Sequence, residues 1–433
     1  LPQSGTTLTL GSSGDTVTVP SGVSLAPGGG LTLTGNFVVD GGTIKLDGNY
    51  PTGTNNVALG DTALDSVQAG GVSNTAIGSL AGTAITTGDS NIAIGHEALK
   101  TNTTAGENTA IGVASLRDNT AGCRNVAIGQ NAMLVNTEGC FNVAVGRAAL
   151  DANLTGDRNV AIGLSALGSN TTADCNVAVG QSALGTNTTG ANNVAVGHVA
   201  LLANTTGADN TAVGSSALTS NTTGFNNSAL GRCALFSNTE GDKNTSIGMS
   251  TLRCNLTGCS NTAVGYTALL KNTASDNTAV GCGALICNTT ASFNTAIGSC
   301  SLNANTTGVQ NTAIGADALK ANTTANNNVA VGDDSLAANT TGTSNVAVGQ
   351  GAMNTNTEGN CNISIGHRSM DLNTTGSNNT AVGQDAMRCN TTGTNNVAFG
   401  FCSLNCNSTA SHNTAIGVEA LNKNTTGCFN QAV

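Results

Sequence analysis

The sequence has little charge, few aromatic side chains and no tryptophan. Charged residues make up 9% and aromatic residues 2% of its 433 positions, against about 25% charged residues in an average soluble domain. Only 14 positions are Lys or Arg, whereas 24 are Asp or Glu, and the formal net charge is -10. Because nucleic-acid binding needs a basic surface, we expect no nucleic-acid partner. The composition also argues against an enzyme, and we expect no catalytic residues, no cofactor and no metal site.

Long hydrophobic runs are missing as well. No stretch approaches the roughly 20 consecutive apolar residues of a membrane-spanning helix, and residues 1–4 lack the charge and the apolar run of a secretion signal. We therefore expect no membrane insertion. Three glycines at 28–30 are not followed by the lysine and helix of a phosphate-binding loop, so they do not predict a phosphate site.

What the sequence does have is a repeat. The pentad Asn-x-Ala-x-Gly occurs 22 times, twice with Ser in place of Ala, and its glycines follow a 17-residue period in 19 of the 21 intervals. Of the other two intervals, the one from Gly60 to Gly78 is longer by one residue and the one from Gly265 to Gly281 is shorter by one. A twenty-third pentad begins at Asn430, and we expect the array to continue. Positions in the repeat are numbered below from the pentad glycine, which is position 0.

The apolar positions predict a short strand and a core. Position -1 is Val or Ile in 19 of the 22 copies, and position +4 is Leu or Met in 21. β-Branched residues in a short run bounded by turn residues are typical of a strand. We expect the side chains at -1 and +4 to fill the core. Val213→Asp, at -1, would then unfold or disassemble the fibre, whereas Ser215→Asp, at +1, would be silent.

Three positions hold small residues. Position -2 is Ala in 20 copies and Ser in two, so it faces either the middle of a narrow coil or a neighbouring chain. Position 0 is always Gly, which indicates a positive φ or a close backbone approach. Position +10 is mostly Gly but also Ala or Ser, so it requires smallness more than a positive φ. If these columns meet another chain, Ala212→Leu would weaken chain association.

Asparagine occupies two further positions without exception. It stands at -4 in all 22 copies and at +7 in all 20 copies from Asn102 to Asn424. In stacked coils these columns would become ladders, in which each side-chain amide binds its counterpart in the next coil and ties down the turn. The alternative is that Asn merely tolerates turn dihedrals. The ladder explains an unbroken column better.

A single repeat unit is too short to bury its own apolar face, so successive units must stack and share one core. The fold class is therefore all-β: a stacked β-solenoid or β-roll of 17-residue repeats. We expect an irregular N-terminal β segment at 1–50 and a shaft of 22 repeats at 51–433. Because each coil has a thin core, we also expect a parallel homotrimer. The alternative is a single-chain solenoid.

The 14 cysteines occupy variable positions of the repeat. Two pairs share a position in consecutive coils, Cys123 with Cys140 and Cys389 with Cys406, and stacking would place their Cα atoms about 5 Å apart, within disulfide range. Most other cysteines have no such partner, and we expect reduced thiols that pack as small hydrophobic side chains. Spacings such as Cys254/Cys259 lack histidine partners, which disfavours zinc.

Other candidate chemistry has simpler explanations. His96, His198 and His367 share position +1, where a trimer could gather three copies of one histidine around a metal, but that position elsewhere holds Asp, Gln, Ser and Phe, as a surface site would. Asn-x-Thr sequons recur at +7, yet the Asn stays where Glu138 or Glu240 removes the sequon, so structure holds it. Ice binding by the threonines at +8 and +9 is disfavoured because adjacent residues cannot share a strand face.

The repeat resembles those of known fibre proteins. Residues 193–197 (Asn-Val-Ala-Val-Gly), with Ala-Leu at 200–201 and Asn-Thr-Thr-Gly at 204–207, are similar to the arrays of phage tail fibres, and the pentad resembles an element of the head modules of trimeric autotransporter adhesins. Residues 4–20 are similar to N-terminal stretches of marine phage structural proteins. The resemblance implies a homotrimer, and many phage members end in an intramolecular chaperone domain, which these 433 residues do not contain.

These observations predict the structural shaft of a trimeric viral tail fibre, located on the virion. Its expected partners are other copies of itself, tail or baseplate proteins, and a host receptor bound through a tip outside this fragment. The alternative is a bacterial surface adhesin of the trimeric autotransporter type, whose rod would itself bind a host partner. The low charge and the absence of Trp favour a spacer over a binder.

Overall fold

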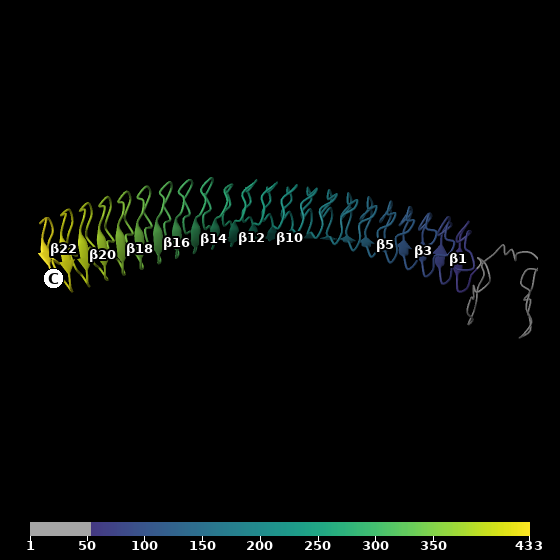
Figure 1. Ribbon diagram of the computed structural model, residues 1–433, viewed down its shortest axis with the longest axis horizontal. Helices are drawn as coiled ribbons and strands as arrows, with labels where there is room; N and C mark the ends of the chain where they lie inside the picture. Colours follow the sequence, from purple (N-terminus) through teal and green to yellow (C-terminus); the bar gives the residue numbers. More distant parts are fainter. Residues whose placement is uncertain (1–52) are drawn as a thin grey trace, which may run out of the picture. The chain divides into compact units, whose positions relative to one another are not determined.

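The computed structural model describes residues 53–433, which form a parallel β-solenoid (Figure 1). No helix occurs in this range, and each coil contributes one short strand. The N-terminal β segment expected at 1–50 lies outside the described residues. The strands are β1 (Val57–Leu59), β2 (Thr75–Ile77), β3 (Ile92–Ile94), β4 (Thr109–Ile111), β5 (Val126–Ile128), β6 (Val143–Val145), β7 (Val160–Ile162), β8 (Val177–Val179), β9 (Val194–Val196), β10 (Thr211–Val213), β11 (Ser228–Leu230), β12 (Thr245–Ile247), β13 (Thr262–Val264), β14 (Thr278–Val280), β15 (Thr295–Ile297), β16 (Thr312–Ile314), β17 (Val329–Val331), β18 (Val346–Val348), β19 (Ile363–Ile365), β20 (Thr380–Val382), β21 (Val397–Phe399), β22 (Thr414–Ile416) and β23 (Gln431–Ala432).

The strands stack in sequence order into one parallel sheet. Each strand pairs with the next so that equal positions of the repeat face each other, as Val194 faces Thr211 between β9 and β10. The coils of unusual length keep this register, because Val57 pairs with Thr75 and Thr262 with Thr278. The predicted strand in the pentad and the predicted 17-residue stacking are therefore confirmed.

Hydrogen bonding between coils continues outside the strands. The amide of Leu201 donates to the carbonyl of Ala217 in the next coil at 3.0 Å, and the amide of Ala203 donates to Thr219 at 2.9 Å. The amide of Val199 donates in the opposite direction, to Gln181 of the preceding coil, at 3.0 Å. Most of the coil backbone is thus bonded to its neighbours, which satisfies polar groups that a single repeat unit cannot satisfy alone.

The interior of each coil is narrow and filled by small residues and, in nearly every coil, one leucine or methionine. The side chains at -2, +3 and +4 are fully buried, as Ala195, Ala200 and Leu201 show in one coil. Position +4 is therefore core, as predicted. The small residue at -2 faces the middle of its own coil, so Ala212→Leu would disrupt the coil itself and not primarily a contact between chains.

The prediction that position -1 belongs to the core is wrong. Alternate residues of a strand point to opposite faces, and Asn at -4 and Ala at -2 both point inward. Positions -3 and -1 must then point outward, and Val213 is accordingly only half-buried. The outward position leaves Leu230 49% and Phe399 54% exposed.

The backbone adopts a left-handed conformation at several non-glycine positions of each coil. One coil shows this at Val199 (φ 50°), Leu201 (φ 54°) and Asp209 (φ 58°), which occupy positions +2, +4 and +12. Such values are unfavourable for a branched or bulky residue. Hydrogen bonds to both neighbouring coils and burial of the leucine hold the backbone in this conformation. Contacts between coils, and not the preferences of these residue types, therefore offset the strain.

Candidate functional site

The two asparagine columns form ladders of hydrogen bonds inside the stack. In the strand ladder, at position -4, the backbone amide of Asn210 donates to Oδ1 of Asn193 one coil earlier at 3.0 Å. In the turn ladder, at +7, Nδ2 of Asn204 donates to Oδ1 of Asn187 at 2.7 Å. Both ladders converge on one turn carbonyl, since Asn193 Nδ2 and Asn204 Nδ2 each donate to the oxygen of Gly207 at 2.8 Å. The predicted ladders are confirmed.

The ladders explain the sequons of position +7. Asn204 and its counterparts from Asn102 to Asn407 are fully buried, and both hydrogens of the Asn204 side-chain amide are already donated within the stack. A glycan on this nitrogen would require the coil to open. The turn-ladder asparagine therefore serves the fold, as the sequence interpretation held.

The histidines of position +1 lie on the surface. His96, His198 and His367 are all exposed. Across residues 53–433 no three His, Cys, Asp or Glu side chains gather as a metal site would require. The same range contains no helix long and apolar enough to cross a membrane.

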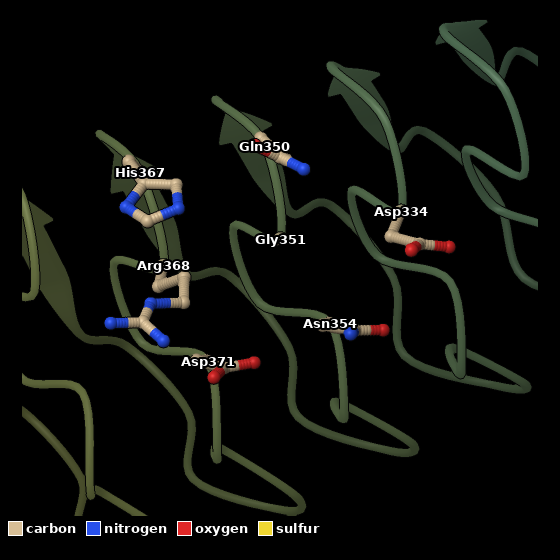
Figure 2. Close-up of a pocket in the computed structure, with 7 residues that line it drawn as sticks. All are labelled: Asp334, Gln350, Gly351, Asn354, His367, Arg368 and Asp371. Carbon is tan, nitrogen blue, oxygen red and sulfur yellow. The ribbon is translucent and has the colours of Figure 1, made fainter.

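One shallow pocket of about 180 Å³ opens on the turns that follow β17 to β19 (Figure 2). It is lined by Asp334, Gln350, Gly351, Asn354, His367, Arg368 and Asp371. These residues come from three successive coils at positions +1, +2 and +5. Gly351 has no side chain at +2, where the flanking coils carry Asp334 and Arg368, so the pocket is the gap that this glycine leaves in a column.

Charged residues beside the pocket pair along the stack. Arg368 Nε lies 3.4 Å from Asp385 Oδ1, and Arg388 Nε lies 3.8 Å from both Asp385 Oδ1 and Asp371 Oδ2. Burial raises the pKa of Asp371 above its ordinary value, against the opposing effect of Arg388 and Arg368. The charges largely neutralise one another. Two of these ion pairs join neighbouring coils, and the pair of Arg388 with Asp385 lies within one coil.

The cysteines are all free thiols in the structure. Three of the four at position +11, Cys140, Cys259 and Cys428, share a specific role with Asp, Asn and Ser. The side chain at +11 accepts a hydrogen bond from the backbone amide at +11 of the preceding coil. Asp157 Oδ1 accepts from the amide of Cys140 at 2.7 Å, and Cys140 Sγ accepts from the amide of Cys123 at 3.0 Å. This role gives a structural reason for the recurrence of cysteine at +11, where four of the 14 cysteines stand.

A further candidate interaction surface is the outward face of the sheet, which we call the outer face and define as positions -3 and -1 from β1 to β22. Position -3 is Val, Ile, Thr or Ser and position -1 is Val, Ile, Leu or Phe, so no charged residue occurs on this face. Every side chain at -1 is at least partly exposed. Sequence reasoning missed this face, although the parity of the inward Asn at -4 and Ala at -2 would have revealed it.

Comparison with known proteins identifies no relative: no protein-family model, curated protein or solved structure matches this chain. Functional inference therefore depends on the solenoid and on its faces.

Proposed function

We propose that residues 53–433 form the shaft of an elongated homotrimeric viral tail fibre, which holds a host-attachment part of the fibre away from the particle. The observation that carries the proposal is the outer face. Large continuous apolar surfaces on soluble proteins mark interaction sites. On this face position -1 is apolar in all 22 strands, position -3 carries either an aliphatic or a hydroxyl side chain, and no strand carries a charge.

A second copy of the same chain is the occupant that fits this face best. The face repeats once per coil, and each strand lies one inter-strand spacing, about 4.8 Å, from the next. Another copy laid parallel to it has the same spacing along its full length, so the two faces match coil for coil. A globular partner would match only a few coils. The β-branched side chains at -3 and -1 would then gain the burial that a single chain leaves incomplete.

A threefold arrangement lets each outer face contact both neighbouring chains around one axis and closes without leaving an open face. It also accords with the resemblance of the repeat to fibre proteins that are homotrimeric. The remaining surface of the coil has little that favours tight binding, because the chain has no Trp and only two Tyr and binding hot spots favour Trp, Tyr and Arg. The proposed role of this region is therefore that of a spacer.

The oligomer is tested by light scattering on the purified 433-residue chain. The proposal expects a single species of three times the chain mass of 42.4 kDa. A well-folded monomer would refute the trimer and favour the single-chain solenoid. A dimer would keep the outer face as an interface but refute the threefold arrangement.

The tail-fibre assignment needs a separate test. Antibodies against the purified chain should label filaments that project from virus particles in electron micrographs. Labelling of a bacterial surface instead would favour the alternative, an adhesin of the trimeric autotransporter type. In that case the purified shaft should also bind host cells by itself, whereas a spacer should not.

A further inference from the structure

Cys123 and Cys140 bring two thiols into direct contact. They occupy position +11 of consecutive coils, and their sulfur atoms lie 3.0 Å apart. Both side chains are partly exposed, so small solutes reach them. The rest of the fold does not use this contact, because the sheet and both asparagine ladders pass through the two coils independently.

The backbone fixes one sulfur above the other. The amide of Cys123 donates to Cys140 Sγ at 3.0 Å, while the amide of Cys140 is held by Asp157 Oδ1 at 2.7 Å. This pattern is the one that Asp, Asn and Ser form at +11 elsewhere. The contact between the sulfurs therefore follows from the repeat geometry, with cysteine present in two coils running.

The other pair of equivalent cysteines in consecutive coils is oriented differently. Cys389 and Cys406 occupy position +6, where the polar contacts of Cys406 Sγ are the side-chain oxygens of Asn405 and Asn422, both at 3.9 Å. The two pairs have the same spacing in the sequence but differ in the orientation of their side chains. Only at position +11 do the two thiols point toward each other.

We propose that Cys123 and Cys140 form a disulfide that covalently joins adjacent coils when the fibre meets an oxidising medium. The oxidant is a small-molecule disulfide such as oxidised glutathione. One cysteine thiolate attacks a glutathione sulfur, which forms a mixed disulfide and releases one glutathione thiolate. The second cysteine thiolate attacks the protein sulfur of that mixed disulfide and releases the other. Two protein thiols are oxidised, the glutathione disulfide is reduced to two thiols, and these take up the two protons.

The consequence is a local staple that closes the short loop between Cys123 and Cys140, one repeat in length. A cross-link between residues of this separation restricts the unfolded chain and resists separation of the two coils. The proposal does not depend on the oligomeric state, because both cysteines belong to one chain.

Peptide mapping tests the proposal on the intact 433-residue chain. Trypsin cuts after Arg117, Arg124 and Arg147, which places the two cysteines in separate peptides, 118–124 and 125–147, with one cysteine each. After incubation with oxidised glutathione and blocking of remaining thiols, we expect these peptides to be recovered joined and lighter by two hydrogen atoms than their sum. Reduction should separate them. Recovery of both peptides as blocked thiols or stable glutathione adducts would overturn the proposal.

Two controls separate the staple from other cross-links. Under denaturing, non-reducing electrophoresis the oxidised chain should run as a monomer, and a ladder of larger species formed through these peptides would show links between chains and overturn the intrachain staple. Oxidation should raise the midpoint of thermal unfolding of the wild type, and Cys123→Ser should abolish that rise. Cys175→Ser, at an exposed position +12, is the matched control and should retain it.

Discussion

Asn255 and Asn272 are consecutive members of the turn ladder, but no hydrogen bond joins them. Asn272 Nδ2 donates instead to the carbonyl of Ala274 at 2.7 Å, and Asn255 Oδ1 is buried without a partner. This coil is the one that is shorter than the regular repeat by a single residue. Every other consecutive pair from Asn102 to Asn424 is bonded, so a single missing turn residue breaks the ladder at one coil.

Restoring the missing residue should stabilise the stack. Inserting Thr between Thr273 and Ala274 recreates the Asn-Thr-Thr-Ala turn that residues 288–291 already have. Because the insertion gives Asn255 Oδ1 a donor, we expect a gain of about 1–3 kcal/mol in the free energy of unfolding. Chemical denaturation measures the gain, and amide exchange around residue 255 should slow.

The control for this insertion is the same residue added where the repeat is complete. A Thr inserted between Thr205 and Thr206 lengthens a regular turn and should destabilise the chain. Equal effects of the two insertions would contradict the explanation from the ladder.

The turn ladder also predicts the effect of an isosteric change. Asn204→Asp replaces a donor by an acceptor that faces two further acceptors, Asn187 Oδ1 and Gly207 O. The site is fully buried, so we expect a loss of about 3 kcal/mol or more at neutral pH. Thermal unfolding measures it. Asn327→Asp, at an exposed +12 position, should change stability little, and a comparable loss there would remove the ladder as the cause.

The sequence was enough to predict the period, the stacking register and both ladders, because these depend on residues that recur in every coil. The side of the strand that faces inward was predicted wrongly, although the alternation of Asn and Ala in the pentad carried that information. The prediction used hydrophobicity, which favours Val213 for the interior, whereas the interior is set by the alternation that buries Asn210 and Ala212. The left-handed backbone at Leu201 left no sequence signal, because contacts between coils and not residue preference hold it. The outer face was missed because assigning Val213 to the core hides the alternation that turns positions -3 and -1 outward.

The two glycine columns should respond differently to alanine. At position 0, Gly214 has φ 135°, and an added β-carbon would lie 2.7 Å from the carbonyl carbon of Gly231. We expect Gly214→Ala to cost about 2–4 kcal/mol, because strain and overlap add. Gly207→Ala, at +10, also requires the turn of the next coil to shift, but it should cost clearly less, since Ala173 occupies the same position naturally without a positive φ. Denaturation of both variants measures the difference, and equal losses would contradict it.

Asp151 makes stability depend on pH in a defined direction. Burial raises the pKa of its carboxyl group above the ordinary value. A group whose pKa is raised by folding contributes stability that is present below its unfolded pKa and lost as the pH rises through the folded value. At neutral pH the charged Asp151 carboxylate therefore lowers the free energy of unfolding, and Asp151→Asn should remove this loss.

We expect Asp151→Asn to raise the free energy of unfolding at pH 7 by up to about 1 kcal/mol, a small gain because solvent reaches part of the side chain. Below about pH 3, where the carboxyl group is protonated, the substitution should have no effect. Denaturation at both pH values measures this. Asp333→Asn, which removes an exposed carboxylate, should match the wild type at both. A stabilisation that persists at low pH would point to packing and not to charge.

The outer face gives the test that joins the fold to the proposed function. Val213 points away from its own coil and is half-buried in the single chain. Val213→Asp therefore should leave the coil folded, contrary to what a core position would predict. In the proposed trimer it places three carboxylates in an apolar interface, where unpaired charges are costly. We expect a folded chain that has lost its threefold mass, with circular dichroism unchanged and light scattering reporting the monomer.

Ser215→Asp is the matched control for this variant, because Ser215 lies two residues further along the same coil and is exposed at position +1. It adds the same charge outside the outer face and should keep the oligomer intact. If both variants keep the wild-type mass, the outer face is not the interface. If Val213→Asp unfolds the chain even at dilutions where the wild type is dissociated and folded, the side chain supports the coil itself. Loss of association with the fold retained is the one result that identifies the outer face as the surface through which the chains assemble.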